Sequence, residues 1–345
     1  TMSSDPNLPD GPATFVGTVY KKSQGVYTVR AEDGRRLTCA ISNRLRKVLI
    51  YPTAAPTSLH HRVQAVREIR DLDPVAVGDL VRATLAGDGT GLITEVQPRR
   101  NALTRLAASD HGAAGRTSKD GFKTQVIAAN VDQIVAVMTA AGPAPKWELL
   151  DRYLAAAELS GVGAFVCLTK ADLLDEPEAA EELLEEVLVY RRLGYPVAVV
   201  SAATGAGLDE VRDCLQGRLS VFVGKSGAGK TTLLNALQPG LGLRVKQVNA
   251  VTGKGKHSTT HLELFDLDFG GQVVDTPGMR EFGLDRIEPD DLAYGFVDLR
   301  PYLGACKFGL DCAHDHEPGC AVKAAVAAGQ VSERRYRSYL RLREG

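Results

Sequence analysis

Long apolar runs are missing from the sequence. In its 345 residues no apolar stretch approaches about 18 residues, the length at which a helix can cross a membrane. Residues 1–12 are polar and rich in proline, and they contain no apolar segment of the kind found in secretory signals. These absences predict no membrane partner and favour a cytoplasmic protein.

An excess of charge of one sign is also missing. Lys and Arg number 41 against 42 Asp and Glu, so the formal net charge of −1 gives the whole molecule no strong attraction to nucleic acid. Local excesses do occur, because residues 1–110 carry 15 basic and 11 acidic residues, and residues 321–345 carry 6 basic and 2 acidic ones. Such modest excesses fit either a solvated surface or a local contact with RNA.

The distribution of cysteine does not indicate a disulfide framework. Of six cysteines, Cys306, Cys312 and Cys320 cluster near the C-terminus, and in a chain without an export signal such a cluster favours a metal site. Together with His314 they supply three thiolates and one imidazole, the donor set of a closed structural Zn²⁺ site. His316 is a rival for the fourth position.

Short alternating segments fill the N-terminal part of the chain. Their alternation of apolar and polar residues and the glycine-containing turns between them predict β-strands at residues 14–20, 26–30, 36–41, 80–85 and 92–96. Strands this short, spread over roughly 90 residues, indicate a small barrel, for which the OB type is the leading candidate. Residues 43–73 are less regular and are expected to form a long loop or insertion.

A different pattern begins near residue 126. Apolar runs predict buried strands and alternate with helical periodicity, which together predict a parallel sheet covered by helices on both faces. Residues 322–343, near the C-terminus, are rich in arginine and helix-like. The expected strands are residues 131–138, 164–168, 197–200, 219–223 and 272–274, and the expected helices are residues 146–159, 178–193 and 208–215.

A phosphate-binding loop of the form G-x-x-x-x-G-K-[ST] follows one of these strands and precedes a helix-like segment, as the motif requires. Its backbone N–H groups can wrap a phosphate, Lys230 is expected to reach the β- and γ-phosphates, and Thr231 to bind Mg²⁺. Downstream, Asp275 ends a strand and can hold Mg²⁺ through water, while the N–H of Gly278 can sense a γ-phosphate. The loop consists of Gly224, Lys225, Ser226, Gly227, Ala228, Gly229, Lys230, Thr231 and Thr232.

Two loops upstream favour guanine as the base. The carboxylate of Asp172 can accept two hydrogen bonds from the guanine edge, which adenine does not offer, so a site built around that pair rejects adenine. After the next strand, a backbone N–H can reach the guanine oxygen. The sequence thus predicts GTP and GDP as ligands, bound through Thr169, Lys170 and Asp172 and through Ser201 and Ala202.

The order of these loops resembles that of circularly permuted GTPases. In translation-factor-like GTPases the phosphate loop comes first and the N-K-x-D and S-A motifs come last, whereas here the T-K-A-D and S-A loops precede the phosphate loop. With a barrel before it and a Cys/His cluster after it, the chain resembles the small-ribosomal-subunit biogenesis GTPases of the RsgA family over residues 13–340.

This resemblance implies a fold and a set of partners. The fold is an α/β P-loop GTPase domain, circularly permuted and with a mostly parallel sheet, flanked by an OB-type β-barrel and a zinc-binding α-helical module. His314 agrees with the family's C-x-H pattern, and one structural Zn²⁺ is expected, with Mg²⁺ accompanying GTP. The expected partners of a monomer are the small ribosomal subunit and its rRNA. The domains are expected at residues 13–105 (barrel, RNA binding), 106–125 (linker), 126–283 (permuted GTPase) and 284–345 (zinc-binding domain).

Three further segments resemble family features. Residues 255–261 resemble switch I, which leaves Thr259 or Thr260 as the Mg²⁺-sensing threonine. Residues 275–282 resemble switch II, and residues 98–105 resemble the segment that joins the barrel to the GTPase domain.

Two positions bear on hydrolysis and one on base selection. Met279 stands where many GTPases carry a water-orienting Gln, so intrinsic hydrolysis is expected to be slow. The resemblance implies that His257 can position the water instead; the alternative is a loop histidine without a catalytic role. Thr169 replaces the Asn of N-K-x-D, which leaves one guanine contact weaker.

The sequence therefore predicts a GTPase that acts as a switch in late maturation of the small ribosomal subunit and is stimulated by that subunit. The alternative belongs to another class of function: a nucleotide-gated RNA-binding or scaffold protein in which hydrolysis is incidental. A second alternative, an ATPase or small-molecule kinase, predicts that ATP competes equally with GTP.

Overall fold

The structure is a computed structural model, and it describes residues 13–23, 25–50, 65–68, 74–106, 124–241, 262–275 and 291–344. The chain divides into two compact units, Thr1–Asn130 with His261–Leu264, and Val131–Thr260 with Phe265–Gly345. Within the described ranges no helix is long and apolar enough to cross a membrane. The finer division into barrel, linker, GTPase domain and zinc-binding domain stays a prediction.

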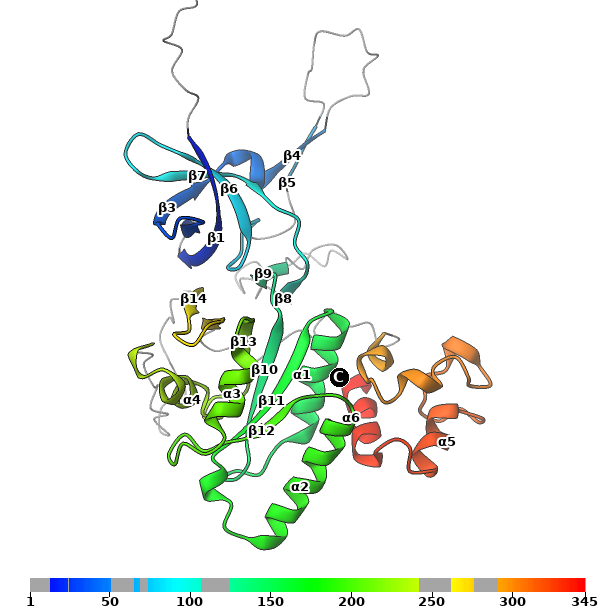
Figure 1. Ribbon diagram of the computed structural model, residues 1–345. Helices are drawn as coiled ribbons and strands as arrows, with labels where there is room; N and C mark the ends of the chain where they lie inside the picture. Colours follow the sequence, from blue (N-terminus) through cyan, green and yellow to red (C-terminus); the bar gives the residue numbers. More distant parts are fainter. Residues whose placement is uncertain are drawn as a thin grey trace, which may run out of the picture. The chain divides into compact units, whose positions relative to one another are not determined.

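The first unit is built around a small barrel (Figure 1). Its strands are β1 (Thr14–Ser23), β2 (Val26–Ala31), β3 (Arg36–Ile41), β6 (Leu80–Leu85) and β7 (Gly91–Val96). Antiparallel pairs join β1 to β2, β2 to β3, β6 to β7 and β1 to β6, and a parallel pair joins β3 to β7, so the ring closes. The predicted OB-type barrel is confirmed, and β1 continues beyond its predicted end.

Alternation along the strands fills the barrel. Tyr27 and Val29 of β2 are fully buried, as are Val19 of β1, Val81 of β6 and Ile93 of β7. Because successive side chains of a strand point to opposite faces, each strand contributes every second residue to this core. The apolar–polar alternation of the sequence is therefore the direct cause of the closed barrel.

Two strand pairs were not predicted. The expected loop or insertion at residues 43–73 contains β4 (Lys47–Ile50) and β5 (Ala65–Glu68), which pair antiparallel and which the sequence did not reveal. β8 (Ala102–Leu106) and β9 (Thr124–Ala129) form a second antiparallel pair. Each pair joins short segments through long-range hydrogen bonds, and segments of this length show too few alternations to be recognised.

The predicted joining segment contributes a buried ion pair to the first unit. Asp79 is fully buried, and Arg99 donates to both of its carboxylate oxygens at 2.7 and 2.8 Å. The N–H of Ala76 donates a further bond of 2.7 Å to the same carboxylate. Arg100 is bound to Asn130 through its backbone N–H at 2.9 Å and its guanidinium at 2.8 Å. These two arginines therefore hold the first unit together.

The second unit contains the predicted parallel sheet (Figure 1). Its strands lie in the order β12-β11-β10-β13-β15, and every neighbouring pair is parallel. All seven residues of β10 are buried, as expected for a central strand covered on both faces. The strands are β10 (Gln133–Thr139), β11 (Gly163–Thr169), β12 (Val197–Val199), β13 (Leu219–Val223) and β15 (Gln272–Asp275).

Helices cover the two faces of this sheet. The helices are α1 (Trp147–Leu159), α2 (Pro177–Arg192), α3 (Leu208–Leu215) and α4 (Lys230–Leu237). Figure 1 shows α3 and α4 on one side of the strands and α1 and α2 on the other. Val211 of α3 and Leu233 of α4 share one apolar cluster with Val135, Phe165 and Phe222 of the sheet. The alternation of strands and helices is confirmed as a doubly covered parallel sheet.

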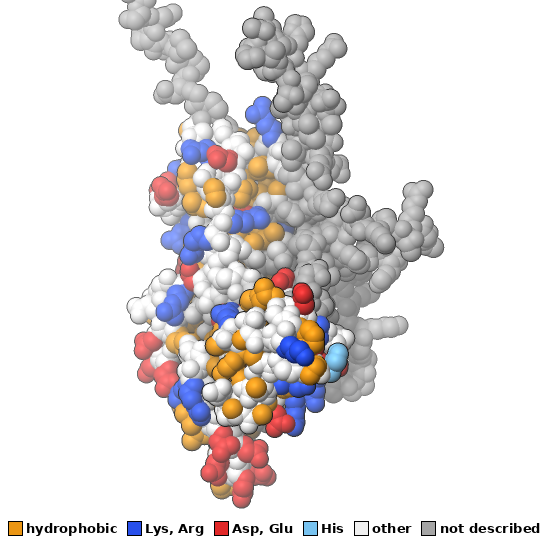
Figure 2. All heavy atoms as spheres, turned by 90° about the vertical axis from the view of Figure 1, so that its right-hand side faces the viewer, with side chains coloured by type: hydrophobic (Ala, Val, Ile, Leu, Met, Phe, Trp, Pro, Cys, Tyr) orange, Lys and Arg blue, Asp and Glu red, His pale blue; other side chains and the backbone are white. Residues whose placement is uncertain are grey.

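The acidic helix α2 is amphipathic. Leu183, Val187 and Tyr190 recur at helical spacing and are buried, and the acidic residues of the helix all lie at other positions. Figure 2 shows these acidic side chains gathered at the lower end of the molecule.

The C-terminal stretch packs onto α1. Its helices are α5 (Ala321–Ala327) and α6 (Glu333–Glu344), so the predicted helix-like stretch at residues 322–343 is divided in two, with Gly329 at φ +70° between them. Ala155 of α1 shares an apolar cluster with Phe296, Val322 and Tyr339 from the C-terminal stretch. This cluster joins the Cys/His region to the parallel sheet through α1.

Buried charges strengthen the same junction. Arg335 of α6 is 1% exposed, and it donates to Asp151 of α1 at 2.5 Å and to both oxygens of Asp298 at 2.8 Å. Arg334 donates to Asp151 at 2.8 Å and to the Tyr190 hydroxyl at 2.9 Å. Burial opposes the charge of Arg335, but the two carboxylates outweigh it and raise the pKa of the guanidinium above its ordinary value. The guanidinium of Arg335 therefore keeps its charge within the junction.

Replacing Arg335 with Ala should destabilise the second unit by about 3–5 kcal/mol, because it removes the guanidinium that binds both oxygens of Asp298 and leaves Asp151 with Arg334 as its remaining cation. Urea unfolding followed by the fluorescence of Trp147, which stacks on Tyr190 at 5.7 Å, measures this loss. Arg337→Ala on the same helix is the matched control, since Arg337 is 65% exposed and pairs with Glu333 alone among the described ion pairs. Equal stability of both variants would contradict the role of the buried network.

Candidate nucleotide site and metal centre

The predicted phosphate-binding loop connects β13 to α4. Gly224 has φ +147°, and a Cβ atom placed there would lie 2.3 Å from the carbonyl oxygen of Val137 in β10. Gly227 and Gly229 have φ of +84° and +88°, a region that side chains rarely adopt. Close approach and backbone conformation therefore require glycine at these positions, and the loop has the shape that the motif predicts.

Lys230 begins α4 and folds back over the loop. Its Nζ donates to the carbonyl oxygens of Gly224 at 2.6 Å and Lys225 at 3.0 Å. Thr231 and Thr232 stand in the first turn of the same helix, whose N-terminus carries positive potential. The ammonium, the helix N-terminus and the loop together form an anion-binding arrangement.

The two predicted guanine loops lie side by side. They follow the carboxyl ends of the neighbouring strands β11 and β12, and Ser201 joins them by donating from its hydroxyl to Asp172 at 2.5 Å. Ser201 is 1% exposed and also accepts a bond of 3.2 Å from the N–H of Thr204. The N–H of Ala171 donates to the carbonyl of Val200 at 3.1 Å. The bond from Ser201 thus orients the Asp172 carboxylate, and the other two hold the loops that carry these residues.

Thr169 has a contact that the sequence did not reveal. Its hydroxyl lies 2.7 Å from the carbonyl oxygen of Ala228 in the phosphate loop and 3.1 Å from that of Met138 in β10. A hydroxyl has one proton, so it donates to one of these carbonyls at a time. The side chain is 3% exposed and points at the phosphate loop, and it thereby links the T-K-A-D loop to that loop. The one available signal was a threonine at the asparagine position of N-K-x-D.

Several predicted residues lie outside the described ranges. His257, Thr259, Thr260 and Gly278 are among them, and their roles stay predictions. Asp275 ends β15, as expected, and the structure describes its backbone.

The predicted metal ligands come together in the C-terminal stretch. One ligand atom from each of Cys306, Cys312, His314 and Cys320 lies within 4.8 Å of all the others, and all four residues are buried. The Sγ atoms of Cys306 and Cys320 are 3.8 Å apart, too far for a disulfide bond, which needs about 2.05 Å. Nδ1 of His314 lies 3.4 Å from the Cys306 sulfur. Three soft sulfur donors and an imidazole could hold a metal ion here.

Surrounding groups support this cluster. Backbone N–H groups donate to the Cys306 sulfur from Ala321 at 3.2 Å and to the Cys320 sulfur from Lys323 at 3.5 Å, and Cys320 caps the N-terminus of α5. The Tyr336 hydroxyl donates to the carbonyl of His314 at 2.7 Å. These partners of the ligand residues had no signal in the sequence.

The histidine in the cluster is suited to metal binding. Burial lowers the pKa of His314, so its ring is neutral at pH 7, as a ligand must be. His316, the rival ligand, is 84% exposed and lies beside Asp315, outside the cluster.

Two solved structures resemble this chain along most of its length. The crystal structure of YjeQ from Thermotoga maritima matches with a TM-score of 0.72 at 30% sequence identity, covering 96% of this chain and 98% of that one. YloQ, described as a circularly permuted GTPase, matches with a TM-score of 0.68 at 28% identity, covering 96% of this chain and 94% of that one.

Several proteins named small ribosomal subunit biogenesis GTPase RsgA are similar in sequence. The protein of Bacteroides fragilis is 35% identical over 328 residues, which are 95% of this chain and 96% of its own length. That of Pseudomonas aeruginosa is 44% identical over 270 residues, 78% of this chain and 75% of its own.

The fold, the order of the loops along the chain and the comparisons all indicate the same class of protein. A phosphate loop after β13, with the T-K-A-D and S-A loops on strands that precede it in the chain, defines a circularly permuted P-loop GTPase, an enzyme that hydrolyses GTP. A family model described as RsgA GTPase matches residues 96–285, more than half of the sequence. The chain belongs to the RsgA GTPase family.

Replacing Thr169 with Val should weaken GDP binding roughly fivefold to tenfold, because one buried hydrogen bond between the T-K-A-D loop and the phosphate loop is lost. Isothermal titration calorimetry with GDP and Mg²⁺ measures the change. Thr139→Val is the matched control: that hydroxyl is also buried and donates to a carbonyl at 2.7 Å, but its acceptor, Pro143, is not a residue of the phosphate loop. Equal losses in the two variants would show that Thr169 has no special link to the loop.

Proposed function

We propose that this GTPase acts as a switch in late maturation of the small ribosomal subunit and that the subunit stimulates its hydrolysis of GTP. The observation that carries the proposal is the assembled site, in which Thr169 and Ser201 hold the guanine loops and the phosphate loop in one arrangement. The names of the similar proteins, which are ribosome-biogenesis GTPases, support the choice of partner.

Each part of the site takes a role in this proposal. The phosphate-loop N–H groups and Lys230 bind the β- and γ-phosphates, and Thr231 with Asp275 would hold Mg²⁺, which neutralises charge developing on the phosphates. Asp172 accepts the guanine N–H groups, and the loop at Ser201 and Ala202 donates to the guanine oxygen. The rigid Ser201–Asp172 bond supports this assignment because it pre-orients the carboxylate.

The switch residues are assigned by resemblance. Thr259 or Thr260 senses Mg²⁺, the N–H of Gly278 senses the γ-phosphate, and His257 positions the attacking water when the subunit orders its loop. Met279 leaves the usual glutamine position without a polar group, which supports a requirement for an external stimulus.

Zn²⁺ is the proposed ion of the Cys/His cluster. Three thiolates and an imidazole fill a tetrahedral shell, so the ion would be structural and would leave no open position for chemistry. It would hold the residues before α5 and α6 in place, and α6 is the helix that Arg335 joins to α1.

The barrel and the C-terminal zinc-binding domain are the proposed rRNA-binding parts. Strands of OB-type barrels present a surface that binds nucleic acid, and both ends of the chain carry a modest basic excess. A role on the small subunit would place the monomeric protein in the cytoplasm.

A turnover assay tests the function. Wild-type protein should hydrolyse GTP slowly alone and at least tenfold faster with small ribosomal subunits, since a positioned water and ordered switch are worth this much or more. His257→Ala should keep its GDP affinity and lose the stimulation.

Other outcomes separate the alternatives. Subunit binding without any stimulation would favour the scaffold protein with incidental hydrolysis. Equal competition by ATP would favour an ATPase or kinase. Stimulation that persists in His257→Ala would remove that residue from the catalytic assignment.

Zinc content tests the metal assignment. The purified protein should carry one zinc per chain by mass spectrometry, and Cys312→Ser should lose most of it because one of four ligands is replaced. Cys214→Ser is the matched control, since Cys214 lies outside the cluster. A wild-type protein that holds no zinc, or a Cys312→Ser variant that holds as much as the control, would contradict a structural zinc site.

A further inference from the structure

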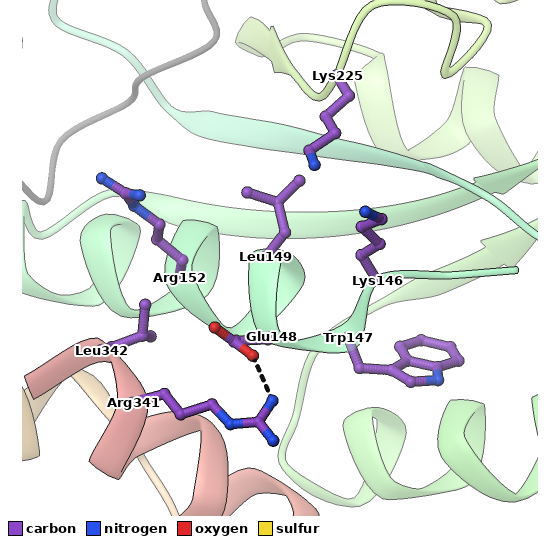
Figure 3. Close-up of a pocket in the computed structure, with 8 residues that line it drawn as sticks. All are labelled: Lys146, Trp147, Glu148, Leu149, Arg152, Lys225, Arg341 and Leu342. Atoms are coloured by element: carbon purple, nitrogen blue, oxygen red, sulfur yellow. Dashed lines mark hydrogen bonds and ion pairs between the residues drawn. The ribbon is translucent and has the colours of Figure 1, made fainter. Parts of the chain in front are cut away.

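A basic hollow lies beside the phosphate loop. It has a volume of about 520 Å³ and is formed where the phosphate loop, the start of α1 and the end of α6 meet (Figure 3). All of these elements belong to the second unit. The residues that line it are Lys146, Trp147, Glu148, Leu149, Arg152, Lys225, Arg341 and Leu342.

The lining is strongly unbalanced in charge. Four of its side chains are cationic and one, Glu148, is acidic. Glu148 accepts from Arg341 at 2.8 Å, and both side chains are substantially exposed, so this pair offsets a single positive charge. Figure 3 shows Lys146 and Lys225 pointing toward one another across the hollow. Two ammonium groups so placed repel each other, and an anion between them relieves the repulsion.

The form of the hollow favours a polyanion over a single small anion. Its cations come from three separate elements and stand around its edge, and they do not converge on one point. The two lysines are flexible point charges, which suit a phosphodiester backbone. Figure 3 shows the Trp147 ring pointing away from the lysines, so this ring does not stack a base between them.

We infer that this hollow binds backbone phosphates of RNA. The inference rests on the proposed ribosomal function and adds to it a specific contact site in the GTPase domain. Lys225 belongs to the phosphate loop, so a bound RNA phosphate lies against the loop that holds the nucleotide. Arg341 belongs to α6, so the same contact reaches the helix that follows the Cys/His cluster.

Trp147 gives a local reporter of binding. It is the single tryptophan of the chain, it lines the hollow, and it stacks on Tyr190. Full-length protein saturated with GDP and Mg²⁺ is titrated with a mixed-sequence RNA hairpin while Trp147 fluorescence is followed. A saturable change is expected, and its affinity should fall steeply with salt because counterions are released.

Charge reversal tests the site. Lys146→Glu should weaken the RNA-dependent change and make the plot of log affinity against log salt less steep by about one unit. Arg192→Glu is the matched control with the same change in net charge. Arg192 is exposed in the last turn of α2 and lies outside the hollow, so this variant should behave as the wild type. GDP affinity and the urea midpoint of Lys146→Glu should equal those of the wild type, which establishes that the variant is folded.

Three results would overturn the inference. It is overturned if RNA binds without changing Trp147 fluorescence, if Lys146→Glu and Arg192→Glu respond alike, or if inorganic pyrophosphate saturates the signal where RNA does not, which would assign the hollow to a free phosphate compound. The proposed function has a separate readout, the stimulation of wild-type turnover by subunits, which is measured without the RNA titration and without the Lys146 variant.

Discussion

The second unit depends on one buried charge cluster, in which Arg335 lies between Asp151 of α1 and Asp298. Removing charges from water is costly, and this cost is recovered only because both carboxylates are bound by guanidinium groups with good geometry. Asp151 accepts from Arg334, Arg335 and Tyr190 together. With so many directional bonds, α6 has a single register against α1.

This fixed register explains how distant parts of the sequence form one site. α1 follows β10, whose end lies against Gly224 of the phosphate loop, and α6 follows the Cys/His cluster. The cluster, the junction and the nucleotide loops therefore belong to one continuous packed unit, although Cys306 and Thr169 are far apart in the chain. Thr169 completes the connection by binding the phosphate loop from the neighbouring strand.

Local motifs were predictable from the sequence, whereas long-range contacts were not. The phosphate loop and the Cys/His cluster could be recognised because their glycines, lysine and thiols lie close together in the chain. Arg334 and Arg335 were counted with the basic excess near the C-terminus, yet both form ion pairs with carboxylates from other elements. They therefore add little to the positive charge available for RNA binding. Nothing in an arginine-rich stretch distinguishes a buried arginine from an exposed one until its partner is known.

The sulfur of Cys320 also caps the first turn of α5, by accepting from the N–H of Lys323. α5 spans 7 residues, fewer than the roughly 12 that an isolated helix needs to persist in water. Forming the first turn is the unfavourable nucleation step of a helix. A metal ion that fixed this sulfur would therefore also stabilise the first turn of α5. Helix α5 would then acquire its shape in step with the supply of the metal, and newly made protein would complete this part of its fold only where that metal is present.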